Sequence, residues 1–238
     1  MKMNPRMLRR GFTLVELLVV IAIIVTLAGV GVPAIIAQKK KGDRAEAVSN
    51  AKQIGLALFT FQEDYGSYPC EATATEVKAN TESTMTFGTT YSNDLFRQLI
   101  AAGMIDQEKP FYAKAPYTKK PDNVTSQSKA LAAGEVGFAY IMATSTDPIS
   151  TSGNSARPIA AAAVYNAQSD GTFDPDLYEK KAVVLRLDNS VSVDSIRPSD
   201  KKVLVGGGKT LLQGGDQDTV WGADVNPVLR PPQKAGSN

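Results

Sequence analysis

The sequence predicts an α+β protein, in which a long N-terminal helix crosses a membrane with its first half and packs on a small antiparallel β-sheet with its second half. Two observations carry this prediction. Residues 17–37 form an uncharged apolar run of the roughly 20 residues that a membrane-spanning helix needs. Several short β-prone segments separated by turn residues follow in the second half of the chain.

The amino-acid composition excludes several classes of protein. The 238 residues suffice for one domain and an anchor, and 43% hydrophobic with 21% charged residues predicts that most of the chain folds. A net charge of +2, without a basic cluster interleaved with aromatics, predicts no nucleic-acid partner. The sequence has no histidine, which excludes histidine-based triads and histidine metal ligands. Its single cysteine, Cys70, excludes an intrachain disulfide.

The N-terminal region divides into a leader and an apolar helix. Residues 1–11 form a short leader that contains Lys2, Arg6, Arg9 and Arg10. Residues 12–37 are apolar on every side, as expected of a membrane span or the core of a filament. Gly29, Gly31 and Pro33 weaken the helix locally and offer a place to bend.

Residues 38–65 continue the helix as an amphipathic segment. Apolar residues there recur at alternating spacings of four and three, which places them on one helical stripe: Ala47, Ala51, Ile54, Leu58, Phe61 and Tyr65. Gly66 and Pro69 then end the helix. We expect the stripe to pack against the sheet of the same chain.

Residues 66–199 form the globular part. Residues 71–90 and 114–129 are weakly patterned and predict surface loops, whereas 93–103 predicts a short helix ending near Gly103. Strands are expected at 136–143, 158–165, 182–187 and 190–196, the last two joined as a hairpin. Alternation in the hairpin predicts a sheet covered on one face only. The Gly-, Pro- and Asp-rich tail, 200–238, predicts an extended segment whose last eight or so residues are disordered.

The order of a basic leader, Gly11-Phe12-Thr13-Leu14-Val15-Glu16 and a long apolar helix resembles the class III signal of type IV pilins and type II secretion pseudopilins. The resemblance implies that a prepilin peptidase cleaves between Gly11 and Phe12 and methylates the new amine of Phe12. It further implies that Glu16 pairs with this amine on a neighbouring subunit. Pro33 lies at the place of a proline that often kinks the helix in this family.

The resemblance implies a structural subunit of a type II secretion pseudopilus or a type IV pilus-like filament. Its partners would be the prepilin peptidase, other copies of itself, minor subunits, the assembly machinery and the membrane. The implied location is the bacterial inner membrane, with the N-terminus cytoplasmic and the C-terminal domain periplasmic. The positive charges on the two sides of the apolar run balance, so this orientation follows from the cleavage motif alone.

Two other classes of function compete with the filament subunit. A minor pilin could act as a binding module in adhesion or DNA uptake, with loops 71–90 or 114–129 as its contact surface. A membrane-anchored enzyme would need a catalytic cluster, and no convincing one is present, so we predict that the chain is not an enzyme. The Gly206–Thr210 segment lacks the first glycine and the following helix of a phosphate-binding loop.

Acidic residues offer the only candidates for a cofactor, which would be calcium. One group is Asp170, Asp174 and Asp176, and the other, in the tail, is Asp216, Asp218 and Asp224. Neither has the spacing of an EF-hand. Major pseudopilins carry calcium in a C-terminal acidic loop, so the resemblance favours the tail group, with solvated loop acids as the alternative.

Overall fold

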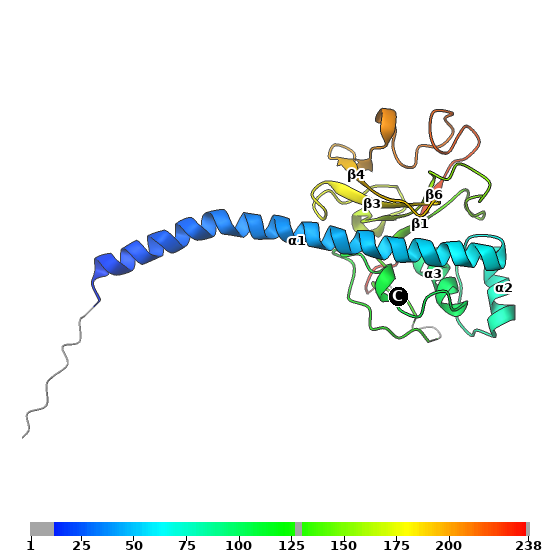
Figure 1. Ribbon diagram of the computed structural model, residues 1–238, viewed down its shortest axis with the longest axis horizontal. Coiled ribbons are helices and arrows are strands. Elements are labelled where there is room, and N and C mark those ends of the chain that lie inside the picture. Colours follow the sequence, from blue (N-terminus) through cyan, green and yellow to red (C-terminus); the bar gives the residue numbers. More distant parts are fainter. Residues whose placement is uncertain (1–11, 127–129, 237–238) are drawn as a thin grey trace, which may run out of the picture. The chain divides into compact units, whose positions relative to one another are not determined.

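A computed structural model describes residues 12–126 and 130–236. It divides into two compact units, residues 1–39 and residues 40–238. Helix α1, Leu14–Tyr65, contributes residues to both units (Figure 1). The predicted α+β class, with a long N-terminal helix and an antiparallel sheet, is confirmed.

The second half of α1 is part of the core of the C-terminal unit. The predicted stripe is buried, with Ile54 and Phe61 both fully shielded from solvent. Gly55 lets the helix approach the sheet closely, because a Cβ atom there would lie 2.8 Å from a methyl carbon of Leu185. The buried amide of Asn50 donates hydrogen bonds to the carbonyl oxygens of Lys109 (3.2 Å) and Tyr112 (2.8 Å).

Two short helices follow α1. Helix α2, Glu71–Thr81, occupies a segment for which the sequence predicted a loop, so that prediction is wrong. The sequence of α2 shows only weak helical periodicity. Buried Thr73 holds α2 in place, because its hydroxyl donates a hydrogen bond to the Gln98 side chain at 2.7 Å. Helix α3, Ser92–Ala101, confirms the second predicted helix, and a 3₁₀ turn, η1 (Lys109–Phe111), follows it.

Six strands form one antiparallel sheet in the order β5-β4-β3-β2-β1-β6. Their bounds are Ala139–Met142 (β1), Pro158–Ala162 (β2), Lys181–Arg186 (β3), Val191–Arg197 (β4), Lys202–Val203 (β5) and Val228–Arg230 (β6). The predicted hairpin is the pair β3–β4, with Val183 opposite Val193. Two further 3₁₀ turns, η3 (Tyr165–Ala167) and η4 (Gly206–Gly208), lie in the connections.

The central strands are buried on both faces. Every residue of β1 and β2 is buried, and so are the four inner residues of β3. The expectation of a sheet with one open face is therefore wrong for these strands and fits only the partly exposed β4. A run of small alanines in β2, at positions 160–162, leaves room for layers on both sides.

The tail is part of the folded domain. It supplies β5 and β6, and it adds Leu211, Trp221 and Leu229 to the core. The expectation that its last eight or so residues are disordered is wrong for 231–236, which form backbone hydrogen bonds. The Gly134 amide donates to the Gln233 carbonyl oxygen at 2.8 Å, and the Ala235 amide donates to that of Tyr117 at 3.1 Å.

Candidate functional site

The start of α1 carries a reciprocal cap built by Thr13 and Glu16. The carboxylate oxygen Oε2 of Glu16 accepts hydrogen bonds from the Thr13 amide (2.8 Å) and the Thr13 hydroxyl (2.7 Å). The Glu16 amide donates to the Thr13 hydroxyl oxygen at 3.2 Å. These contacts satisfy donors that a helix start leaves unpaired, so α1 begins one residue after Thr13.

Thr13 is the member of this cap whose structural role the sequence analysis did not predict. A threonine followed three residues later by a glutamate is the signature of such a cap, and both residues are visible in the sequence. Both hydrogen bonds that the described residues donate to this carboxylate use Oε2.

The predicted roles of Gly11 and Phe12 in processing and of Glu16 and Pro33 in assembly all stay predictions. Phe12 is described and 77% exposed, which suits a residue at a cleavage site. Gly11 lies outside the described residues. Pro33 lies within α1, and its side chain is outside the described part of the structure.

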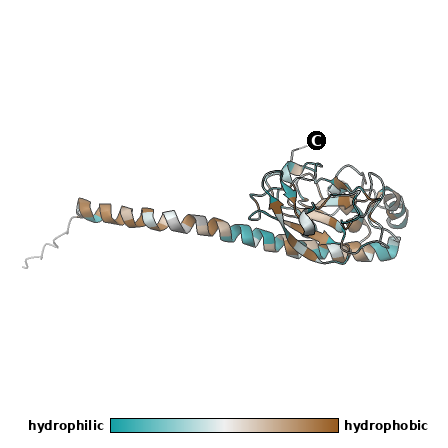
Figure 2. Cartoon of the chain, turned by 90° about the horizontal axis from the view of Figure 1, so that it is seen from above, coloured by the Kyte–Doolittle hydropathy of each residue, from teal (hydrophilic) through white to brown (hydrophobic). Residues whose placement is uncertain are grey.

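Most residues in the first half of α1 are hydrophobic (Figure 2). Its large aliphatic side chains are exposed, from Leu14 (79%) through Val25 (70%) to Ile35 (68%). Among the described residues, α1 is the one helix long and apolar enough to cross a membrane. Exposed apolar area on this scale requires lipid or protein around it.

The tail acids do not form a common cluster. Asp216 is ion-paired with Lys209, and its Oδ1 accepts a hydrogen bond from the Asp218 amide at 2.9 Å. Asp218 and Asp224 are exposed. Across the described residues, the acidic triad whose carboxylate oxygens converge lies elsewhere, at Glu108, Asp122 and Glu135. Calcium binding by the tail remains a prediction.

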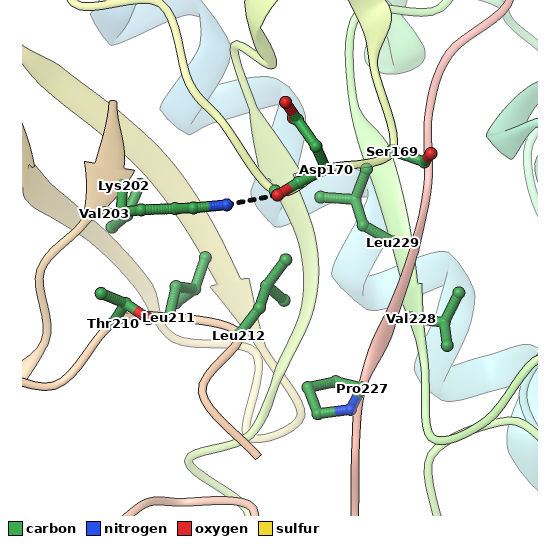
Figure 3. Close-up of a pocket in the computed structure, with 11 residues that line it drawn as sticks. Ser169, Asp170, Lys202, Val203, Thr210, Leu211, Leu212, Pro227, Val228 and Leu229 are labelled. Atoms are coloured by element: carbon green, nitrogen blue, oxygen red, sulfur yellow. Dashed lines mark hydrogen bonds between the residues drawn. The ribbon is translucent and has the colours of Figure 1, made fainter. Parts of the chain in front are cut away.

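A cavity of about 330 Å³ lies between β5, the 169–171 loop and the tail (Figure 3). Lys202 and Asp170 are the only ionisable residues that line it, and the Lys202 ammonium donates to the backbone carbonyl of Asp170. The rest of the lining is mainly aliphatic, including Leu211 and Leu229. This lining offers no pair of groups arranged for acid–base or nucleophilic catalysis.

Comparison with known proteins matches the processing segment. The model for the prokaryotic N-terminal methylation motif matches residues 6–32. The N-terminal segment is therefore similar to the N-terminal segments of pilins and pseudopilins.

Relatives of this pilin-like chain share the same segment. Type II secretion system core protein G of Pectobacterium carotovorum subsp. carotovorum is 43% identical over 61 residues, which are 26% of this chain and 39% of the relative. The protein of the same name from Escherichia coli (strain K12) is 43% identical over 61 residues, 26% of this chain and 42% of the relative. Type IV major pilin protein PilA of Myxococcus xanthus is 41% identical over 66 residues, 28% of this chain and 27% of the relative.

These alignments leave most of the C-terminal domain unmatched. The chain spans about two fifths of the length of the secretion proteins it matches and a smaller share of the pilin. No solved structure matches the chain. The named relatives are secretion-system and pilin proteins, and none of these names is that of an enzyme.

Proposed function

We propose that the chain is a structural subunit of a type II secretion pseudopilus or a related pilus-like filament. The observation that carries the proposal is that the methylation motif, matched at residues 6–32, includes the start of an apolar helix whose large described side chains are exposed. Removal of residues 1–11 leaves that helix at the N-terminus of the mature protein. Helices of this kind associate in lipid by close packing and can pack equally in a filament core.

In this proposal Glu16 has two roles. Oε2 caps its own helix through Thr13. Oε1 accepts a hydrogen bond from the methylated, protonated Phe12 amine of a neighbouring subunit. A carboxylate within hydrocarbon is costly, by about 2.5–3.5 kcal/mol at the centre, so a cation from another copy stabilises the packed state. The pair would then set the axial register between subunits.

The proposed orientation places the N-terminus in the cytoplasm of the inner membrane and residues 40–238 in the periplasm. Cleavage by a cytoplasm-facing prepilin peptidase motivates this orientation. The chain offers no energy-coupling site among its described residues, so separate assembly machinery would drive polymerisation. A binding role for a minor subunit is less favoured, because the relatives include a core secretion protein and a major pilin.

The intact mass and N-terminal sequence of the protein from membranes of its native host test the processing step. We expect a chain that begins with N-methylated Phe12. A chain that still begins with Met1 in cells with active prepilin peptidase would contradict the proposal.

Assembly is tested by Glu16→Ala, with Glu63→Ala as a control in an exposed part of the same helix. We expect Glu16→Ala to abolish sedimentable filaments while leaving the melting temperature of the C-terminal domain unchanged. Glu63→Ala should assemble normally. Equal assembly of both variants would contradict the register role of Glu16.

A further inference from the structure

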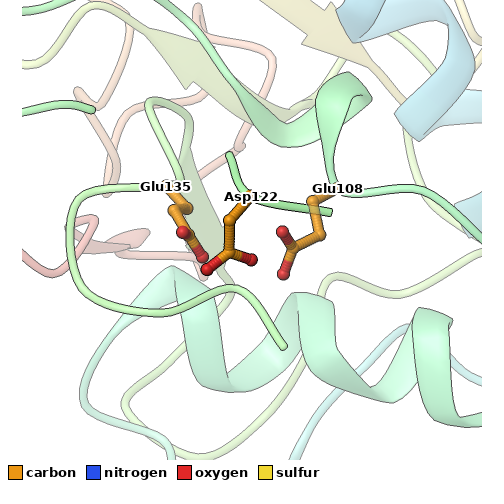
Figure 4. Close-up of side chains that lie close together, drawn as sticks. All are labelled: Glu108, Asp122 and Glu135. Atoms are coloured by element: carbon orange, nitrogen blue, oxygen red, sulfur yellow. The ribbon is translucent and has the colours of Figure 1, made fainter. Parts of the chain in front are cut away.

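Three acidic side chains from separate loops meet in the C-terminal unit. Glu108 precedes η1, Asp122 lies in the following loop, and Glu135 precedes β1. Carboxylate oxygens of all three lie within 4.8 Å of one another, and the side chains point toward a common space (Figure 4). The three residues are far apart in the sequence and lie in irregular segments, so no helical or strand periodicity predicts that they meet.

Two of the three carboxylates are fully buried. Glu108 and Glu135 are both 0% exposed, whereas Asp122 is exposed at the rim. A buried carboxylate loses its hydration, at a cost of several kcal/mol for each ion unless a counter-charge replaces the water. Three neighbouring carboxylates add mutual repulsion to that cost. A positive charge between the three carboxylates would therefore stabilise them.

The backbone orients Glu108 for the charged state. Its Oε1 accepts a hydrogen bond from the Leu131 amide at 2.6 Å, and its Oε2 accepts one from the Asn123 amide at 2.8 Å. Each oxygen of Glu108 thus has one backbone donor, which fixes the position of the carboxylate and leaves a lone pair on each oxygen for a cation.

Glu135 supplies an independent observation. Its Oε2 accepts a hydrogen bond from the Ala132 amide at 2.7 Å. Its Oε1 is buried and accepts no hydrogen bond from the described residues. The ammonium of Lys119 lies 3.3 Å from this oxygen on a side chain that is 51% exposed. This oxygen is therefore within ion-pair distance of Lys119 but accepts no hydrogen bond from it, and one half-exposed ammonium opposes three carboxylates.

We propose that Glu108, Asp122 and Glu135 bind a calcium ion that joins the loops preceding β1. Three carboxylates without histidine or cysteine form a hard-oxygen donor set, which suits calcium or magnesium. The three oxygens lie within 4.8 Å of one another, close enough for one cation to contact all three. Calcium accepts irregular geometry from loop ligands, whereas magnesium demands a near-ideal octahedron, so we assign calcium. Waters complete the coordination on the side of exposed Asp122.

In this proposal Lys119 competes with the ion. Its flexible, half-exposed side chain can move into solvent when calcium neutralises Glu135. The ion would then fasten residues 108–123 to residues 131–135. The site is independent of the proposed filament role, because it involves neither residues 12–39 nor the acidic residues of the tail.

Calcium titration calorimetry of the full chain in detergent, after removal of metals with EDTA, tests the site. We expect one calcium ion per chain, weaker binding of magnesium and a higher melting temperature with calcium. Glu135→Gln should weaken calcium binding by about tenfold or more. The variant keeps the shape of the side chain and removes like-charge repulsion, so we expect it to melt no lower than the calcium-free wild type.

Two further variants separate this site from its alternatives. Lys119→Met should tighten calcium binding, because it removes the competing cation. Asp218→Asn, in the tail group, should bind calcium as the wild type does. No binding at millimolar calcium would overturn the proposal, and so would weakened binding in Lys119→Met. Loss of binding in Asp218→Asn with retention in Glu135→Gln would also overturn it and assign calcium to the tail.

Discussion

The two halves of helix α1 use apolar side chains in opposite ways. In the first half Leu14 and Val25 are more than two-thirds exposed, so their burial depends on lipid or on other copies. In the second half Ile54 and Phe61 are fully buried within the same chain. The first half of this helix therefore needs lipid or other proteins to cover its apolar side chains, whereas the second half buries its apolar side chains within the same chain. Changes in the second part should alter domain stability, and changes in the first should alter assembly.

Removing the last strand is the largest expected perturbation of the self-contained part. A chain that ends at Asn226 loses β6, its pairing with β1 and buried Leu229. It also loses the hydrogen bonds that join 231–235 to the start of α3, at Asn93, and to the loop at Gly134. We expect no cooperative thermal transition by circular dichroism, whereas removal of only the last two residues should leave it unchanged. A truncated chain that melts cooperatively near the intact one would contradict this.

Two phenylalanines on α1 provide a matched pair. Phe61 is fully buried and stacks on Tyr65 with ring centroids 4.5 Å apart, whereas Phe59 is 48% exposed. Phe61→Ala should lower the free energy of unfolding by about 3–5 kcal/mol, because it leaves a cavity. Phe59→Ala should change it by about 0.5 kcal/mol or less. Denaturant titration measures the free energy of unfolding of both variants. Similar losses in the two variants would show that the Phe59 side chain is buried and not exposed.

Two glycines should respond to alanine with opposite signs. A Cβ at Gly137 would lie 2.1 Å from the Ala113 carbonyl oxygen, a backbone atom that cannot turn away. Gly137→Ala should therefore cost about 1–3 kcal/mol of unfolding free energy. A Cβ at Gly42, within α1, meets nothing within 4 Å, so Gly42→Ala should stabilise by about 0.5–1 kcal/mol. Thermal melts measure the melting temperature of each variant. Melting temperatures that change in the same direction in both variants would contradict the expected opposite effects.

The smallest expected effect concerns a surface ion pair at the end of β4. The hydrogen bonds from Arg197 lower the pKa of Asp200 to about 2. Because the folded-state pKa is depressed, the contribution to stability is present above the unfolded pKa, near 4, and is lost as pH falls through 2. NMR titration of the Asp200 carboxyl carbon should show this midpoint, and Arg197→Gln should move it toward 4. An unchanged midpoint in the variant would exclude the pair as its cause.

The sequence predicted the parts of the fold that have strong periodicity. The stripe from Ala47 to Phe61 and the β3–β4 hairpin were readable because burial repeats at helical or strand spacing. Helix α2 was missed because Thr- and Ala-rich residues show little amphipathic pattern, and contacts such as Thr73 with Gln98 fix it. The pairing of β6 with β1 joins distant segments, which local patterns do not encode.

The two candidate sites also differ in whether the sequence predicts them. The processing motif and the Thr13–Glu16 cap lie within a few consecutive residues, so spacing alone identifies them. Glu108, Asp122 and Glu135 come together only when irregular loops fold, and nothing in their separations predicts a shared site.

The place of β6 in the sheet also has a consequence for biosynthesis. β1 lies between β2 and β6, and β6 is the last of the six strands in sequence order. During synthesis the other five strands are made first, so the edge of β1 that pairs with β6 stays unpaired until residues 228–230 have been added.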